Sequence, residues 1–81
     1  PGGMGTFDEF FQILTLVELG QKDAPIVLYN LNGYYDVMLD FMRTCTSMGF
    51  IRERALTLFR VCATAKDALD AVEEMYGSRL Q

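Results

Sequence analysis

Short apolar runs alternate with longer segments of helical periodicity along the chain, and this order constrains the fold more than any other feature. From Thr6 onward apolar residues recur every three or four positions, which predicts a helix over about 6–19 with Gly20 as its stop. After a break at Pro25, residues 26–29 form an unbroken apolar run, as is typical of a parallel strand covered on both faces. The chain is therefore predicted to begin with a helix and a buried strand.

The alternation continues to the end of the chain. Residues 30–33 have the composition of a turn, and a second helix is predicted that ends at Gly49. Its apolar face comprises Tyr35, Met38, Leu39, Met42 and Cys45. Residues 50–57 indicate a loop or short helical turn and residues 58–62 a second strand, after which Thr64 and Asp67 mark the start of a last helix. Because strands that alternate with helices form parallel sheets, the chain is predicted to be α/β, in the order loop, α, β, α, β, α.

Charge and cysteine content narrow the classes of partner. The net charge is −4 and the seven basic residues are scattered singly, so neither nucleic acid nor an anionic membrane is an expected partner. Cys45 and Cys62 lack CxxC spacing and the chain has no histidine, so no metal site is expected and both are predicted to be buried free thiols. No secretion signal and no apolar run of about 20 residues is found. With reduced thiols, this predicts a cytoplasmic protein.

Three glycines stand directly before the first predicted helix. Backbone N–H groups around Gly2, Gly3 and Gly5 could converge on an anion at the positive end of the helix dipole, and the Thr6 hydroxyl could add a further hydrogen bond. Glycine would allow either positive φ or close approach of the backbone. The geometry suits a phosphate monoester, although the pattern taken alone fits a tight structural turn equally well.

Glu9 has two competing interpretations. Thr6 and Glu9 match a capping box, in which the threonine caps the helix and the glutamate bonds back to the cap. Alternatively, the Glu9 carboxylate faces the same pocket as the glycine loop and stabilises positive charge there. Asp8 points about 100° around the helix from Glu9, so we interpret it as an ordinary first-turn acid.

The same residues resemble a known family over nearly all of the chain. PGGMGTFDE fits the signature PGGxGTxxE of LOG ("lonely guy") enzymes at Pro1, Gly2, Gly3, Gly5, Thr6 and Glu9. The segments IVLYNLNGYYDVMLDFMRTCTSMGFI and ATAKDALDAVEEM are similar to the parts that follow in those enzymes. The match extends in the right order and spacing, which is more specific than the glycine loop alone.

The resemblance implies a fold and an activity. Residues 1–81 would be the C-terminal half of a single Rossmann-like nucleotide-binding domain, with an N-terminal half that carries the first strands and an Arg-Lys motif missing. The implied reaction is hydrolysis of the N-glycosidic bond of a cytokinin riboside 5′-monophosphate or AMP, without a cofactor, by a homodimer or larger assembly. The phosphate would bind Gly2, Gly3, Gly5 and Thr6, and Glu9 would act at the ribose with an arginine absent from this chain.

Further residues and two alternatives belong to this hypothesis. Asn30, Tyr34 and Tyr35 follow a strand end, where α/β sheets place ligands, and are expected at a ligand or an interface. Such enzymes have often been labelled lysine decarboxylases, but Lys22 and Lys66 stand in polar positions, so we do not credit that reaction. The alternatives are a carrier of a phosphorylated ligand, similar to molybdenum-cofactor carriers, and a structural fragment with an empty loop.

Overall fold

The computed structural model describes residues 3–79, so the site predictions for Pro1 and Gly2 lie outside the described residues. Helices and strands alternate in the predicted order. The elements are α1 (Met4–Glu18), β1 (Val27–Tyr29), the 3-10 turn η1 (Leu31–Gly33), α2 (Asp36–Ser47), the 3-10 turn η2 (Glu53–Thr57), β2 (Arg60–Cys62) and α3 (Ala65–Arg79). The α/β class is thereby confirmed, and both strands are shorter than the apolar runs that predicted them.

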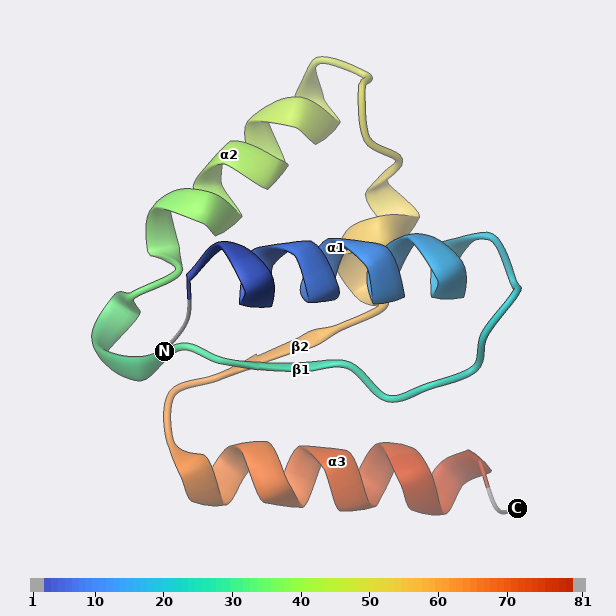
Figure 1. Cartoon of the computed structure of the whole chain (residues 1–81), viewed down its shortest axis with the longest axis vertical. Helices are drawn as coiled ribbons and strands as arrows, with labels where there is room; N and C mark the ends of the chain where they lie inside the picture. The colour runs from blue at the N-terminus through green and yellow to red at the C-terminus, as the bar shows by residue number, and fades with distance from the viewer. Residues whose placement is uncertain (1–2, 80–81) are drawn as a thin grey trace.

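The two strands form a parallel sheet between two layers of helices. Val27 pairs with Arg60 and Tyr29 with Cys62, and the Asn30 N–H donates to the Cys62 carbonyl oxygen at 2.8 Å. Helices α1 and α2 lie on one side of the sheet and α3 on the other (Figure 1). The arrangement is that of a Rossmann-like α/β fragment.

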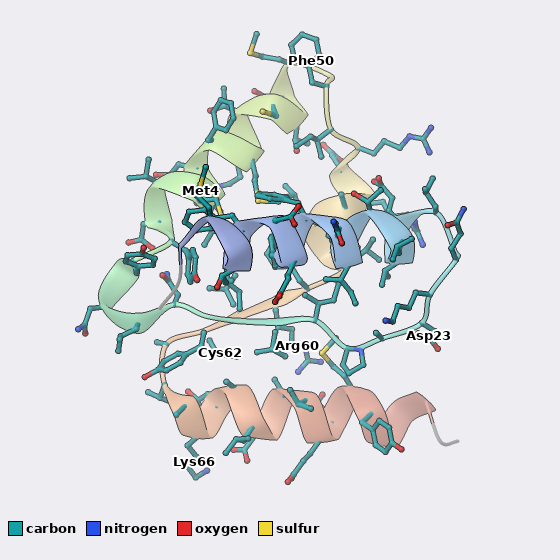
Figure 2. All side chains as sticks on the ribbon, in the orientation of Figure 1. Met4, Asp23, Phe50, Arg60, Cys62 and Lys66 are labelled. Atoms are coloured by element: carbon teal, nitrogen blue, oxygen red, sulfur yellow. The ribbon has the colours of Figure 1, made fainter. Side chains whose placement is uncertain are left out.

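The hydrophobic core lies between the sheet and the layer of α1 and α2. The buried cluster comprises Phe10, Leu14, Ile26, Leu28, Tyr35, Leu39, Met42 and Phe59. The predicted apolar face of α2 turns inward, with Leu39 and Met42 buried. On α1 the buried residues are Phe10 and Leu14, one turn apart, whereas Phe11 is 39% exposed. On the far side of the sheet, Arg60 of β2 reaches Glu74 of α3 with two hydrogen bonds of 3.0 and 3.2 Å (Figure 2).

Both ends of α1 are marked by glycines rather than by side-chain caps. Helix α1 begins at Met4, two residues before the prediction, with Gly3 as N-cap and no side-chain cap hydrogen bond. The capping box of Thr6 and Glu9 is therefore wrong. Gly20 follows the last turn of α1 at φ +74°, as expected of a left-handed stop.

The start of α3 was predicted correctly. The Asp67 N–H donates to Oγ1 of Thr64 at 3.1 Å, which satisfies one of the N–H groups that a helix start leaves without an intrahelical acceptor.

Parts of the sheet expected to be covered are open. The prediction that the first strand is covered on both faces is wrong for Tyr29, which is 39% exposed, and in β2 Val61 is 44% exposed. Cys45 and Cys62 are free thiols but only half-buried, which corrects the expectation of full burial. Exposed large apolar side chains also include Met4 on α1 and Phe50 after α2 (Figure 2). Among the helices of residues 3–79, none is both long and apolar enough to cross a bilayer.

Candidate functional site

One side of the molecule gathers the ends of the elements that ligands use in this class of fold. The carboxyl ends of β1 and β2 and the starts of α1, α2 and α3 all lie on that side (Figure 1). Open α/β sheets bind ligands outside the carboxyl ends of their strands. The predicted site residues on α1 and after β1 are therefore on the appropriate side of the sheet.

The first turn of α1 offers hydrogen-bond donors. The Phe7 N–H donates to the Gly3 carbonyl oxygen at 3.1 Å, which is the first intrahelical bond of α1. The N–H groups of Met4, Gly5 and Thr6 come before it and have no intrahelical acceptor, as at every helix start. Thr6 is exposed, so its hydroxyl is accessible in the same turn. These groups lie at the positive end of the helix dipole, where an anion is favoured.

The glycines of this turn keep space open above the backbone. Gly3 has φ −122°, and neither Gly3 nor Gly5 is among the residues with positive φ, so the conformation itself does not require glycine. A Cβ added at either position would meet no atom of the described residues within 4 Å. Two reasons for glycine were considered in the sequence. Positive φ is wrong for Gly3 and Gly5. Close approach of another group to the backbone is the reason that still applies.

Glu9 lies on the same face of α1 as Thr6, one turn later. Both line a groove of about 370 Å³ that runs between α1 and residues 25–28 of the strand β1 region. Both side chains are exposed, and since Gly3 caps the helix, Glu9 is not engaged in a capping box. The carboxylate is thus positioned beside the turn that carries the donors.

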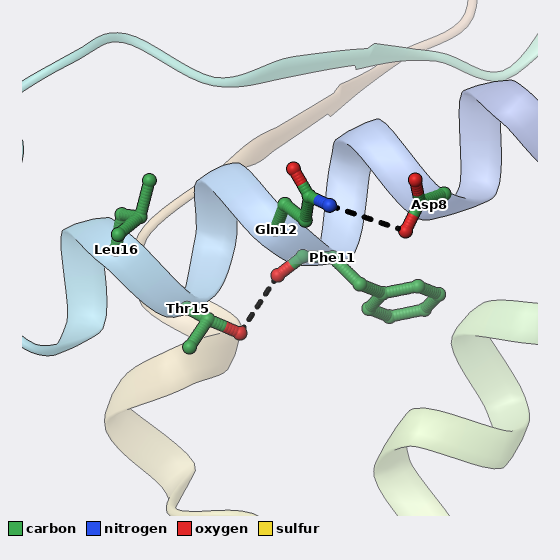
Figure 3. A pocket seen from close by; sticks show the side chains of 5 residues that line it. All are labelled: Asp8, Phe11, Gln12, Thr15 and Leu16. Carbon is green, nitrogen blue, oxygen red and sulfur yellow. Dashed lines mark hydrogen bonds between the residues drawn. The ribbon is translucent and has the colours of Figure 1, made fainter.

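Asp8 faces a different part of the surface. It lines a second hollow of about 410 Å³ with Phe11, Gln12, Thr15 and Leu16 (Figure 3). One Asp8 carboxylate oxygen accepts a hydrogen bond of 3.4 Å from the Gln12 side chain. The two neighbouring acids of α1 therefore serve separate surfaces, and only Glu9 shares one with Thr6.

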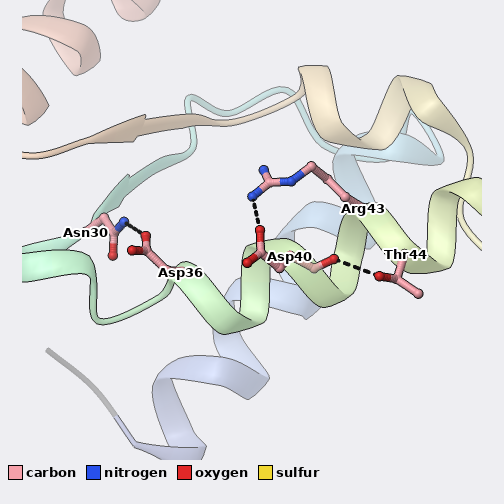
Figure 4. A network of polar contacts seen from close by, with 5 residues as sticks. All are labelled: Asn30, Asp36, Asp40, Arg43 and Thr44. Atoms are coloured by element: carbon pink, nitrogen blue, oxygen red, sulfur yellow. Dashed lines mark hydrogen bonds and ion pairs between the residues drawn. The ribbon is translucent and has the colours of Figure 1, made fainter.

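The three site residues predicted after β1 differ in how accessible their side chains are. Tyr35 is 3% exposed and belongs to the core, whereas Tyr34 is 50% exposed, and the two rings meet edge to face at 5.0 Å. Asn30 is half-buried, and its side-chain amide bonds within the loop to the Tyr35 N–H and to Asp36 (Figure 4). Tyr34 is the one of the three with a largely accessible side chain.

The loop contacts of Asn30 were not predicted from the sequence. The available signal was an asparagine directly after a strand and before a glycine-containing turn, a position at which asparagine often bonds to the backbone a few residues ahead. Phe7 also gained no functional interpretation, yet its ring meets the Tyr35 ring at a centroid distance of 6.2 Å.

The two lysines of the chain do not fit a pyridoxal-phosphate site. A Schiff-base lysine needs an enclosed pocket that lowers the pKa of its amine and holds the cofactor ring. Lys22 is exposed, and the Lys66 side chain is 84% exposed and pairs with Asp70 at 3.0 Å (Figure 2). Neither side chain is in such a pocket.

Comparison with known proteins shows which family this chain resembles. A protein family described as "Possible lysine decarboxylase" matches residues 1–72. The chain is 36% identical over 74 residues to the cytokinin riboside 5′-monophosphate phosphoribohydrolases LOG4 of Arabidopsis thaliana and LOG of Oryza sativa subsp. japonica. The match covers 91% of this chain but 34% and 31% of those two proteins, so the chain spans about a third of the length of these curated relatives.

Proposed function

Because this chain belongs to the LOG family of phosphoribohydrolases, which shares the "Possible lysine decarboxylase" description, we propose that the protein hydrolyses a nucleoside 5′-monophosphate at its N-glycosidic bond. The substrate would be a cytokinin riboside 5′-monophosphate or AMP, and the products the free base and ribose 5-phosphate. The observation that carries the proposal is the shared face of α1, where open helix-start donors and the Glu9 carboxylate lie one turn apart.

The first turn of α1 would hold the phosphate. The N–H groups of residues 3–6 and the Thr6 hydroxyl are donors at the helix start, and Gly2 would extend this loop. The open space above Gly3 and Gly5 supports close approach of phosphate oxygens to the backbone. Binding a phosphate away from the scissile bond positions the ribose, so that binding energy contributes to the reaction at C1′.

Glu9 would act on the ribose as the catalytic carboxylate. In the reaction the bond between C1′ and the base nitrogen breaks and the water oxygen bonds to C1′. One water proton passes to the base nitrogen and the other stays on the new C1′ hydroxyl. Departure of the base leaves positive charge on the sugar, which a nearby carboxylate stabilises. The groove shared by Thr6 and Glu9 supports this role. The resemblance adds the arginine of an Arg-Lys motif, and that motif does not occur in these 81 residues.

The activity is tested by incubating the full-length protein with AMP and with an N6-prenyl analogue of it. We expect release of free base and ribose 5-phosphate, and the ratio of kcat/KM for the two compounds will define the base preference. Folded protein that releases no base above background from either compound would refute the proposal. A carrier of a phosphorylated ligand would bind these compounds without turnover.

We also propose that the protein acts as a homodimer or larger homo-oligomer, as the resemblance implies, and that it is cytoplasmic. Exposed large apolar side chains on α1 and α2, such as Phe11, Val37 and Phe41, support coverage of this surface by further protein. Sedimentation of the full-length protein at micromolar concentration tests the assembly, and a monomer under these conditions would contradict it.

A further inference from the structure

The loop between β1 and α2 has a constrained backbone. Asn32 and Gly33 stand next to each other at φ +51° and +74°, a left-handed pair in the middle of the loop. A Cβ added to Gly33 would lie 2.6 Å from Oδ2 of Asp36, so the Asp36 carboxylate packs directly over this glycine. The left-handed pair and the Asp36 side chain thus constrain the turn from two sides.

Asn30 makes the contacts that hold the loop together. Its side-chain oxygen accepts a hydrogen bond of 2.7 Å from the Tyr35 N–H, and its side-chain nitrogen donates one of 2.8 Å to Oδ1 of Asp36 (Figure 4). Its backbone N–H donates to the Cys62 carbonyl oxygen at 2.8 Å. One residue therefore joins the end of β2, the loop and the start of α2.

Tyr35 carries this constraint to α1. It is 3% exposed, and its ring meets the Phe7 ring edge to face, with centroids 6.2 Å apart and an interplanar angle of 80°. Phe7 directly follows Thr6 and closes the first turn of α1 through its N–H bond to Gly3. A shift of the loop would therefore displace the turn that offers the donors.

We propose that Asn30 is a positioning residue, which sets the first turn of α1 for phosphate through Tyr35 and Phe7. The inference rests on the proposed function, since it assigns that turn to the substrate phosphate. It differs from a ligand-contact role for Asn30, because both polar ends of the Asn30 side chain are engaged inside the loop. Removing the amide should loosen the first turn and weaken phosphate binding more than it affects the chemical step.

The test compares Asn30→Ala with Asn32→Gly in the full-length protein. Asn32 is exposed in the same loop, and glycine keeps its left-handed conformation, so Asn32→Gly is a matched control. We expect Asn30→Ala to raise the Kd for inorganic phosphate and the KM for AMP by about threefold to tenfold, with kcat changed less, and Asn32→Gly to change neither. A folded Asn30→Ala protein with the wild-type phosphate Kd would overturn the inference.

A paired exchange separates positioning from a general loss of stability. Asn30→Asp alone places two carboxylates side by side, whereas Asn30→Asp combined with Asp36→Asn restores an amide and a carboxylate with their roles reversed. We expect the single change to weaken phosphate binding and the double change to recover most of it. A double variant that stays as weak as the single one, although equally stable to heat, would contradict the hydrogen-bond mechanism. Phe7→Leu should weaken phosphate binding as Asn30→Ala does.

Phosphate binding is measured directly by calorimetry, independently of turnover. A wild-type protein that binds phosphate but releases no base from AMP would refute the proposed hydrolysis alone, and the Asn30 comparison would still decide this inference. A wild-type protein that binds neither phosphate nor AMP would overturn both proposals.

Discussion

Replacing Gly33 by alanine tests how firmly the loop between β1 and α2 is held. At φ +74° an alanine costs about 1 to 2 kcal/mol relative to glycine. The added Cβ would also lie 2.6 Å from Oδ2 of Asp36, so that side chain must rotate away and lose its hydrogen bond to Asn30, at a further cost of about 1 kcal/mol. Gly20 has the same φ with open space around it, so Gly20→Ala carries only the conformational cost.

We expect Gly33→Ala to lower the free energy of unfolding by about 2 to 3 kcal/mol and Gly20→Ala by about 1 to 2 kcal/mol. Urea unfolding of the full-length protein, followed by far-UV circular dichroism, measures both. In an Asp36→Ala background the difference between the two glycine variants should vanish, because the clash and the hydrogen bond are both absent. Equal costs for the two variants with Asp36 present would refute the packing of Asp36 over the loop.

Two further predictions concern contacts between elements. The Arg54 guanidinium donates to the Glu18 carbonyl oxygen at 3.0 Å, at the negative end of α1. Arg54→Ala should therefore lower the free energy of unfolding by about 0.5 to 1 kcal/mol. The control Arg52→Ala changes an exposed side chain and should leave the free energy of unfolding unchanged. The hydrogen bonds and charge of Arg60 lower the pKa of Glu74 below its ordinary value of 4.5. Because the pKa of Glu74 is lower in the folded protein, this stabilisation is complete above pH 4.5 and is lost as the pH falls through the lowered pKa. The small difference in the free energy of unfolding between wild type and Glu74→Gln should therefore shrink on acidification. A difference that grows would contradict the ion pair.

Helix boundaries show where sequence patterns succeed and where they fail. Thr64 and Thr6 both begin a pattern typical of an N-cap, yet only Thr64 caps a helix. β2 ends at Cys62, so there is almost no chain left in which α3 could start earlier. Before Thr6, by contrast, Met4 and the glycines are free to join the helix, and glycine is itself an acceptable N-cap.

Burial in the sheet could be predicted only in part. The apolar runs identified both strands and their parallel order, because helix and strand periodicities differ. They did not say which partner covers each side chain, so Tyr29 was expected to be buried and is substantially exposed. The Asn30 contacts depend on where the Tyr35 backbone and Asp36 lie after the left-handed turn, and spacing alone does not specify that geometry.

The proposed function assigns N-glycosidic hydrolysis to the exposed face of α1 that carries Thr6 and Glu9. Its most direct test is AMP turnover by full-length Glu9→Gln beside the matched control Asp8→Asn, whose side chain lines the other hollow. We expect Glu9→Gln to lower kcat by about two orders of magnitude or more, with phosphate affinity little changed, and Asp8→Asn to keep nearly wild-type turnover. Wild-type turnover by a folded Glu9→Gln protein would contradict the assignment of Glu9 as the catalytic carboxylate.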